Sequence, residues 1–179
     1  MNNLIKKHAK SFYWASFFLS KRTFAKCSSL YNFCRTLDDL ADENIRLEIK
    51  KDKFLKFKDN FLKKNNDDLI IKEMWSVIKS ESISEKVVMD LFDGVETDLQ
   101  EKVHINSKKD LLIYSYRVAG TVGLMMSKIL KVKNKEAFKG AIDLGIAMQL
   151  TNIARDVIED SNRERKYIDP DFSSIKETI

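Results

Sequence analysis

The segment LGIAMQLTNIARDVIEDSNRERKYI (residues 144–168) includes the whole second half of the longest helix that the sequence predicts, which runs from Glu136 to about Arg163. Apolar residues occupy almost every side of this helix, a pattern typical of a helix at the centre of a fold. Polar residues interrupt it at steps of three, four and four and therefore share one face: Gln149, Asn152, Asp156 and Asp160. Because a buried carboxylate without a partner is very costly, this face is expected to meet a ligand, a cation or a network of other polar groups.

An earlier predicted helix, residues 22–42, carries a second polar stripe. Its members are separated by four, three and four residues: Tyr31, Arg35, Asp38 and Asp42. Asp39 lies next to this stripe. Two aspartates four positions apart on a helix repel each other by roughly 0.2–0.5 kcal/mol, and a cation between them would remove the repulsion. The alternative interpretation is an acidic helix end that contacts only solvent.

The composition favours a single helical domain. Hydrophobic residues make up 44% of the 179 residues and charged residues 33%, which is within the range of globular proteins. The chain holds one proline and five glycines, and no Asn-Gly or Asp-Gly pair stands between alternating apolar runs, so β-hairpins are not expected. We therefore predict one all-α domain over residues 1–179.

Charge, cysteines and hydropathy exclude several classes of protein. The formal net charge is +5, but the lysines are scattered over amphipathic segments and no nucleic-acid-binding motif is present, so nucleic acid is not an expected partner. Cys27 and Cys34 offer neither a disulfide framework nor a zinc-binding spacing with the two histidines. The absence of a disulfide framework favours a reducing compartment, so we expect a cytoplasmic protein. No apolar run reaches the roughly 18–20 residues of a membrane span, so an integral membrane protein is not expected, while peripheral contact with a membrane stays open.

The apolar segment from Lys109 to about Leu130 contains two glycines, Gly120 and Gly123. A glycine inside a helix costs about 1 kcal/mol relative to alanine, so the pair needs an explanation. Two explanations are open at this point. The glycines permit close packing of helices, or they mark a helix break that lines a cavity.

The two polar stripes together indicate a particular chemistry. Aspartate and asparagine oxygens suit Mg²⁺, which commonly bridges to the phosphates of a substrate. Arg35 and Arg155, near the two stripes, would add fixed positive charge for phosphate oxygens. A cavity otherwise lined by apolar side chains fits a hydrocarbon, so the expected substrate is a hydrocarbon phosphate ester. Departure of diphosphate from such a substrate leaves a carbocation, which aromatic faces stabilise and which must be kept from water.

Four segments spread along the chain closely resemble the squalene/phytoene synthase family of head-to-head trans-prenyltransferases, and most nearly its bacterial phytoene synthases. They are KSFYWASFFLSKR (10–22), LYNFCRTLDDLADE (30–43), YRVAGTVGLMMSKIL (116–130) and the segment 144–168 quoted above. The resemblance implies an all-α, isoprenoid synthase-type helical bundle around a central cavity. Because members of this family usually continue further, it also implies that the chain is the N-terminal part of the family domain without the last helices.

The same resemblance assigns residues to roles. It implies Mg²⁺, with Mn²⁺ as an alternative, at two motifs that consist of Asp38, Asp39 and Asp42, and of Asn152, Asp156 and Asp160. Residues implied to contact the diphosphate or the reaction centre are His8, Ser11, Phe12, Tyr31, Arg35, Gln149 and Arg155. Residues implied to line the prenyl tunnel are Tyr114, Val118, Ala119, Val122 and Gly123, and Tyr167 is a further candidate. The four stripe aspartates, Arg35 and Tyr31 form the implied catalytic set.

The activity implied by the resemblance is head-to-head condensation of two geranylgeranyl diphosphates to phytoene, through prephytoene diphosphate, in carotenoid biosynthesis. One alternative is a sister activity on farnesyl diphosphate that gives dehydrosqualene, presqualene diphosphate or squalene. Another is a catalytically incomplete fragment that only binds prenyl diphosphate or a partner. Because a long prenyl product is insoluble in water, transient association with a membrane surface is also expected. The sequence leaves the oligomeric state open.

Overall fold

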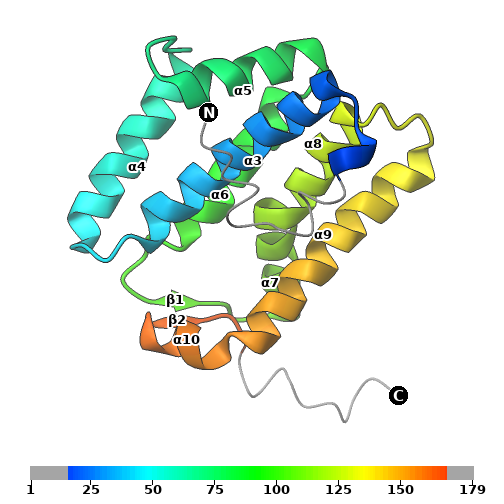
Figure 1. The fold of residues 1–179 in the computed structure, drawn as a ribbon. Coiled ribbons are helices and arrows are strands. Elements are labelled where there is room, and N and C mark those ends of the chain that lie inside the picture. Colours follow the sequence, from blue (N-terminus) through cyan, green and yellow to red (C-terminus); the bar gives the residue numbers. More distant parts are fainter. Residues whose placement is uncertain (1–15, 169–179) are drawn as a thin grey trace, which may run out of the picture. The chain divides into compact units, whose positions relative to one another are not determined.

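The computed structural model describes residues 16–168. These residues form helices joined by loops, together with two strands of two residues each (Figure 1). The predicted all-α class is therefore confirmed. The chain divides into two compact units, which are described separately: Met1–Glu85 with Met125–Lys133, and Lys86–Leu124 with Asn134–Ile179.

The first unit is built around α3 (Lys21–Asp42), which follows a short 3-10 helix, η1 (Ser16–Phe18). The hydroxyl of Ser20 accepts a hydrogen bond from the Thr23 amide at 3.2 Å, which satisfies one of the amides that a helix start leaves unpaired. The buried side chains of α3 follow steps of three and four residues: Cys27, Leu30, Phe33, Leu37 and Ala41. This pattern confirms the helix predicted over residues 22–42.

Aromatic rings join α3 to α4 (Leu47–Leu62) and α5 (Leu69–Ser80). The ring centroids of Phe33 and Phe61 are 5.3 Å apart, and those of Phe61 and Trp75 are 5.0 Å apart. The indole N–H of Trp75 donates a hydrogen bond to the Phe61 carbonyl at 2.9 Å. This carbonyl belongs to the last turn of α4 and also accepts a hydrogen bond from the Lys64 amide at 3.0 Å. The three helices therefore share one aromatic core.

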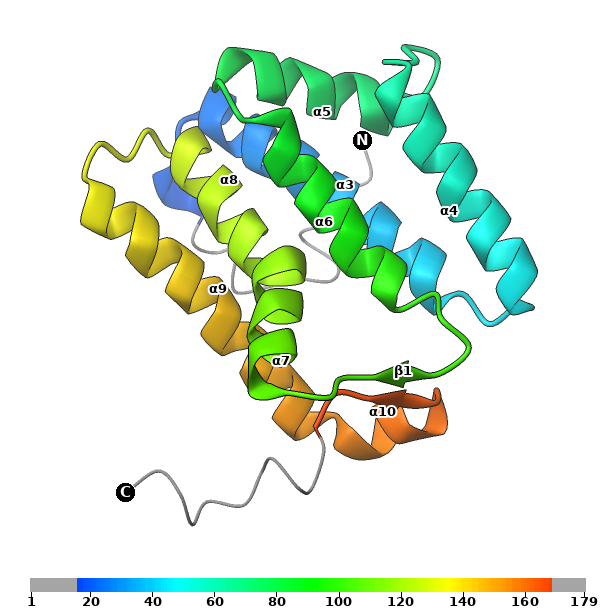
Figure 2. The ribbon, with the colours of Figure 1, turned by 180° about the vertical axis from the view of Figure 1, so that it is seen from behind.

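In the second unit, the first described element is α6 (Glu85–Thr97) and the last is the strand β2 (Arg165–Lys166). The elements between them are β1 (Val103–His104), α7 (Lys108–Ser115), the π-helix η2 (Tyr116–Gly120), the start of α8 (Thr121–Ile129), α9 (Lys135–Arg155) and α10 (Val157–Asn162). β1 and β2 pair in parallel, with Val103 opposite Arg165, and Figure 2 shows the two strands side by side. This pairing joins segments that are far apart in the sequence.

Glycines bring the backbone of α9 into direct contact with η2 and α8. A Cβ atom added at Gly123 would lie 2.2 Å from the carbonyl oxygen of Ala141, and one added at Gly145 would lie 2.5 Å from that of Ala119. These distances leave no room for a side chain. Close helix packing therefore explains Gly123. A helix break, the other explanation offered for the two glycines, is also present. A π-helical turn interrupts the helix at η2, and such turns are frequent at functional sites.

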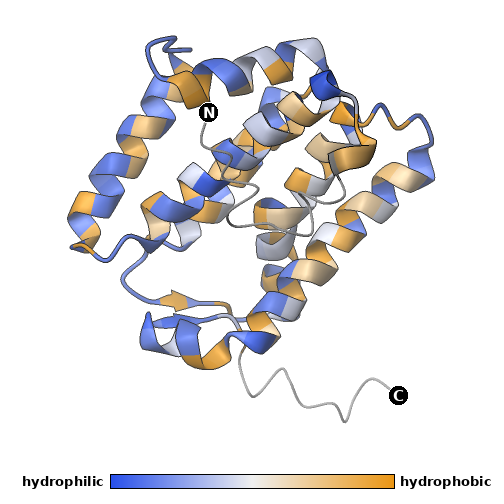
Figure 3. Ribbon diagram, in the orientation of Figure 1, coloured by the Kyte–Doolittle hydropathy of each residue, from blue (hydrophilic) through white to orange (hydrophobic). Residues whose placement is uncertain are grey.

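Contrary to the prediction of a central helix, α9 exposes much of its apolar surface. Leu144 is 62% exposed and Met148 is 47% exposed, whereas Ile153 is buried. Figure 3 shows hydrophobic residues, in orange, recurring along α9. In the described part of the second unit, η2 and α7 pack against α9, and these short elements cover only part of its surface. The prediction is wrong because an apolar sequence shows which side chains can be buried, not which neighbours are present to bury them.

Hydropathy along the helices also bears on membrane insertion. Among residues 16–168, no helix combines the length and the apolar character that crossing a bilayer requires. This holds for α9 as well, although Leu144 and Met148 are exposed on it.

Candidate functional site

The first polar stripe lies at the C-terminal end of α3. Asp38, Asp39 and Asp42 are exposed, and Asp42 is the last residue of the helix. The last turn contains no basic residue. Because the C-terminal end of a helix carries partial negative charge, a carboxylate there is disfavoured by roughly 0.3–1 kcal/mol and a cation is favoured. The stripe is thus electrostatically suited to bind a cation.

Arg35 and Tyr31 lie one and two turns before these carboxylates. The guanidinium of Arg35 forms an ion pair with Asp39, with a distance of 2.7 Å between Nη2 and Oδ1. Tyr31 is half-buried, and its pKa is raised mainly by burial, while Arg35 opposes this effect and Asp38 and Asp39 add to it. Arg35 therefore already carries a carboxylate partner on its own helix.

The second polar stripe stays on one helical face even though the helix is interrupted at Asp156. The amide of Asp156 donates to the Asn152 carbonyl at 2.9 Å, and the amide of Asp160 donates to the Asp156 carbonyl at 2.8 Å. These two bonds continue the helical register from α9 into α10. Asn152, Asp156 and Asp160 are all half-buried. Their side chains therefore project from the same face of the second unit, as does the half-buried Gln149 one turn earlier.

Arg155 binds the central carboxylate of this stripe. Its Nε lies 2.7 Å from Oδ1 of Asp156 and its Nη2 lies 2.6 Å from Oδ2, a two-pronged ion pair. The hydrogen bond from Arg155 lowers the pKa of Asp156 and keeps it ionised. The pKa of Asp160 is instead raised, mainly by burial, and Arg165 opposes that effect. The two carboxylates of the stripe therefore lie in different electrostatic surroundings.

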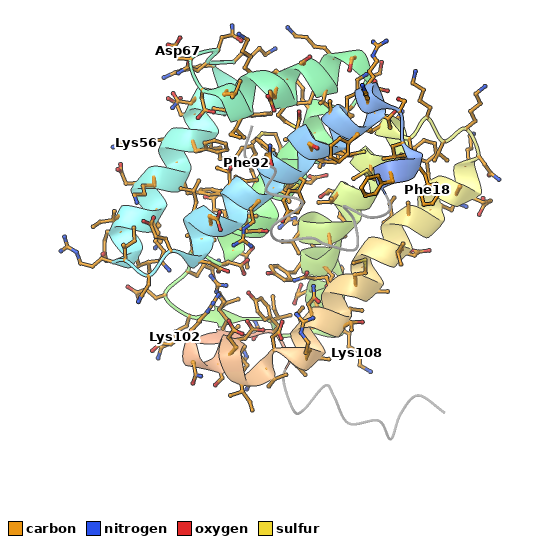
Figure 4. The ribbon with its side chains drawn as sticks, in the orientation of Figure 1. Phe18, Lys56, Asp67, Phe92, Lys102 and Lys108 are labelled. Carbon is orange, nitrogen blue, oxygen red and sulfur yellow. The ribbon has the colours of Figure 1, made fainter. Side chains whose placement is uncertain are left out.

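A pocket of about 610 Å³ opens beside the second stripe, between β1, β2, α10 and the end of α9. Asp160 lines it together with the apolar side chains of Val103, Ile153 and Tyr167. Basic residues line it as well, among them Arg165 and Lys102, which is labelled in Figure 4. The pocket thus combines an apolar wall with cationic side chains, which suits a ligand that is partly hydrocarbon and partly anionic.

Tyr114 and Tyr167, which come from different parts of the sequence, meet in this unit. Their ring centroids are 4.9 Å apart and both hydroxyls reach the carboxylate of Asp98. Both tyrosines were expected site residues, whereas Asp98 was not. Asp98 carries no signal in the sequence, because its partners lie 16 and 69 residues away and no helical or strand periodicity relates them.

The residues expected to line a prenyl tunnel take part in packing. Val118 packs against a cluster of buried side chains that includes Tyr114 and Ile153. Ala119 and Gly123 contact the backbone of α9, as described above, and Val122 is half-buried. The tunnel itself remains a prediction.

Other expected roles are also left as predictions. His8, Ser11 and Phe12 lie outside the described residues. Between Ser16 and Ile168, no three His, Cys, Asp or Glu side chains are arranged as a ready-made metal site. The metal roles of the two stripes are therefore taken up below as a proposal, on the chemistry of their oxygen donors.

Comparison with known proteins identifies the family. Residues 5–171 match the squalene/phytoene synthase family. The chain is 32% identical to phytoene synthase of Rhodobacter capsulatus, over 94% of this chain and 51% of that protein. It is 30% identical to the chloroplastic phytoene synthase 1 of Zea mays, over 94% of this chain and 43% of that protein.

A solved structure agrees with the sequence relatives. The crystal structure of a dehydrosqualene synthase in complex with a ligand superposes with a TM-score of 0.72 at 34% identity, over 94% of this chain and 59% of that one. The fold is therefore the all-α fold of isoprenoid synthases. The chain spans about half of the length of the relatives named here. On these matches, the chain belongs to the squalene/phytoene synthase family.

Proposed function

We propose that the protein condenses two molecules of geranylgeranyl diphosphate head to head to give phytoene, as a step of carotenoid biosynthesis. The observation that carries this proposal is the family match over residues 5–171, which includes both aspartate stripes. The phytoene synthases of Rhodobacter capsulatus and Zea mays support phytoene as the product. The pocket beside Asp160 supports a substrate with an anionic end and a hydrocarbon chain.

The proposed reaction has two parts. First, the C–O bond of one prenyl diphosphate breaks, diphosphate leaves with the electron pair, and the double bond of the second substrate attacks the resulting allylic cation. Loss of a proton then closes the ring of a cyclopropylcarbinyl diphosphate. In the second part, the remaining diphosphate leaves, the ring rearranges, and loss of another proton forms the central double bond of phytoene. No reductant is consumed.

The oxygen donors of the two stripes fit Mg²⁺, with Mn²⁺ as an alternative. Asp38, Asp39 and Asp42 would hold it on α3, and Asn152, Asp156 and Asp160 would hold it on α9 and α10. When bound, the metal supplies positive charge that stabilises the departing diphosphate.

The chain's own side chains have complementary roles in this proposal. Arg165 and Lys102 would bind anionic oxygens at the pocket, while Val103, Ile153 and Tyr167 would exclude water from the hydrocarbon. Arg155 would hold Asp156 ionised until substrate is bound. Tyr31 and Gln149, half-buried on their stripes, would contact the reacting end of the substrate.

A direct assay tests the proposal. The 179-residue chain is incubated with geranylgeranyl diphosphate and Mg²⁺, and both released diphosphate and extracted hydrocarbon are measured. We expect phytoene that disappears with EDTA and falls at least about a hundredfold in Asp38→Asn. Asp67→Asn, which changes an exposed loop aspartate, serves as the matched control and should keep wild-type activity. Near-normal turnover of Asp38→Asn would refute the metal role, and absence of diphosphate release from the wild type would refute catalysis by this chain.

Two observations favour other candidates, and the same assay separates them. The match to a dehydrosqualene synthase at 34% identity favours farnesyl diphosphate as the substrate, so this substrate is assayed in parallel. Binding without turnover is favoured by the exposed apolar side chains of α9. It would appear as calorimetric binding of the prenyl diphosphate with no release of diphosphate.

We also propose that the protein touches a membrane surface transiently, because its hydrocarbon product must reach a bilayer. Leu55 and Leu62 lie seven residues apart on α4, which places them on one face, and each is 53% exposed. Lysines surround them on this helix, among them the exposed Lys56 (Figure 4). An apolar face flanked by lysines fits the surface of an anionic bilayer.

A further inference from the structure

Three separate segments of the second unit converge on the carboxylate of Asp98. Asp98 follows the end of α6, Tyr114 belongs to α7, and Tyr167 follows β2. The hydroxyl of Tyr167 lies 2.6 Å from Oδ1 of Asp98, and that of Tyr114 lies 2.9 Å from Oδ2. The hydroxyl of Tyr114 also lies 3.0 Å from Oδ1. One carboxylate thus accepts a hydrogen bond from each phenol.

The number of available protons fixes the direction of these bonds. A phenol has one hydroxyl proton, and an ionised carboxylate has none to offer. Tyr167 donates its proton to Asp98 across the bond of 2.6 Å. Tyr114 lies 2.9 Å from Asp98 and 3.3 Å from the Tyr167 hydroxyl, so it donates its proton to the nearer acceptor, Asp98. Both phenol oxygens therefore direct their protons toward Asp98 and keep their lone pairs for other neighbours.

The surroundings hold this arrangement in place. Tyr114 and Tyr167 are each 5% exposed, and their rings stack at an interplanar angle of 26°. Burial is the largest cause that raises the pKa of both phenols, and the charge of Asp98 adds to it, so both stay neutral at physiological pH. The guanidinium of Arg165 approaches the backbone carbonyl of Asp98 at 3.5 Å. The cluster therefore ties the end of α6 to the segment that lines the pocket.

We propose that Asp98 is a positioning residue for the condensation, which fixes Tyr114 and Tyr167 so that Tyr167 presents its ring and an electron-rich oxygen at the pocket wall. This inference rests on the proposed function, in which a carbocation forms beside that wall. Hydrogen bonding to an anion increases the electron density on the phenol oxygen, and aromatic faces and fixed dipoles stabilise a cation without reorganisation. Asp98 would thus act on the reaction through the two tyrosines.

A purely structural role for Asp98 is the competing interpretation, and variants separate the two. Asp98→Asn keeps the size of the side chain and removes its charge. Asp93→Asn, on the exposed side of α6, is the matched control. The variant Tyr114→Phe/Tyr167→Phe removes both hydroxyls and retains Asp98, so it addresses the same hydrogen bonds even if Asp98→Asn folds poorly.

The first readout is the condensation rate of these variants, with geranylgeranyl diphosphate as the substrate. We expect Asp98→Asn to lower kcat by about tenfold with little change in KM, because positioning acts on the reacting state. When Asp98→Asn is added to the variant Tyr114→Phe/Tyr167→Phe, it should not lower kcat further, because the hydroxyls through which Asp98 acts are already gone. Full additivity of the two losses, or a loss of equal size in Asp93→Asn, would overturn the proposal.

The second readout does not require turnover. In ultraviolet difference absorption at neutral pH, Asp98→Asn should shift the band of the buried tyrosines to shorter wavelength than in the wild type, because a phenol that donates its proton to an anion absorbs at longer wavelength than one that donates to a neutral amide. An unchanged band would show that Asp98 does not hold the hydroxyls, and would overturn the proposal. A wild-type chain without turnover would instead refute the proposed function alone, because the absorption band would still report the hydrogen bonds of Asp98.

Discussion

The guanidinium of Arg155 donates hydrogen bonds to both carboxylate oxygens of its neighbour Asp156, from Nε to Oδ1 at 2.7 Å and from Nη2 to Oδ2 at 2.6 Å. The pair lies at the point where α9 ends and α10 begins. Asp156 is at the same time the middle residue of the second polar stripe, so its carboxylate is ionised and oriented before any ligand arrives. A cation that binds this face would have to share Asp156 with Arg155.

The pair predicts a pH dependence of stability. Because the folded state lowers the pKa of Asp156, its contribution is present above the unfolded pKa of about 4 and is lost as the pH falls through the lower, folded value. Arg155→Gln should therefore lower the unfolding temperature at pH 7, and the difference from the wild type should vanish toward about pH 2. Thermal unfolding followed by circular dichroism across this range measures it. A difference that persists at low pH would contradict an origin in this ion pair.

The glycine contacts predict a pair of substitutions with opposite signs. Gly123→Ala would place a Cβ 2.2 Å from the Ala141 carbonyl oxygen, and we expect a loss of about 1–3 kcal/mol in the free energy of unfolding. Gly140→Ala, in α9 with nothing within 4 Å of the added Cβ, should stabilise the protein by about 0.5–1 kcal/mol. Urea unfolding of both variants gives the comparison. Equal effects at the two positions would show that the close contact is absent in solution.

The acidic end of α3 predicts stabilisation by Mg²⁺. A ligand that binds only the folded state at ten times its dissociation constant adds about 1.4 kcal/mol, which for a chain of this size raises the unfolding temperature by roughly 3–6 °C. We expect this rise in the wild type and a smaller one in Asp38→Asn and Asp42→Asn. Differential scanning fluorimetry in the presence and absence of Mg²⁺ measures it. Asp67→Asn should respond as the wild type does, and an equal response of all four proteins would place the bound metal elsewhere.

The exposed leucines of α4 predict binding to lipid vesicles. The double substitution Leu55→Ser/Leu62→Ser should weaken affinity for vesicles that contain anionic lipid by about tenfold, because two apolar side chains no longer enter the bilayer surface. Cosedimentation with vesicles of neutral and of anionic composition measures the effect. Leu130→Ser, which changes a leucine of similar exposure at the end of α8 (45% exposed), is the control. A loss of the same size in this control would argue against α4 as the contact surface.

Local periodicity was sufficient to predict the first unit's main helix and the two polar stripes. The spacings of three, seven and four residues among Cys27, Leu30, Leu37 and Ala41 follow from helix geometry, and the structure buries these side chains. The same geometry places Asn152, Asp156 and Asp160 on one face, because hydrogen bonds at the junction preserve the helical register. Which side chains share one face of a helix depends only on residues close together in the sequence, so it could be predicted.

Features that depend on distant partners escaped prediction. The exposure of Leu144 and Met148 depends on which elements cover α9, and composition does not encode that. The role of Asp98 depends on Tyr114 and Tyr167, which reach it only after the chain has folded back on itself. No proline or glycine lies at the break between α9 and α10, so the sequence predicted one continuous helix from Glu136 to Arg163 where the structure has two.

The parallel pairing of β1 and β2 affects the order in which tertiary contacts form while the chain is being synthesised. Val103 leaves the ribosome well before its partner Arg165. Asp98 likewise cannot bind Tyr167 until a further 69 residues have been synthesised. Contacts of such long range form late, because a long loop must first be closed. The aromatic core of the first unit draws on nearer segments and can assemble earlier. A nascent chain halted before residue 165 would hence carry the acidic end of α3 in full and yet lack β2, the partner strand of β1, and the part of the pocket wall that Tyr167 supplies.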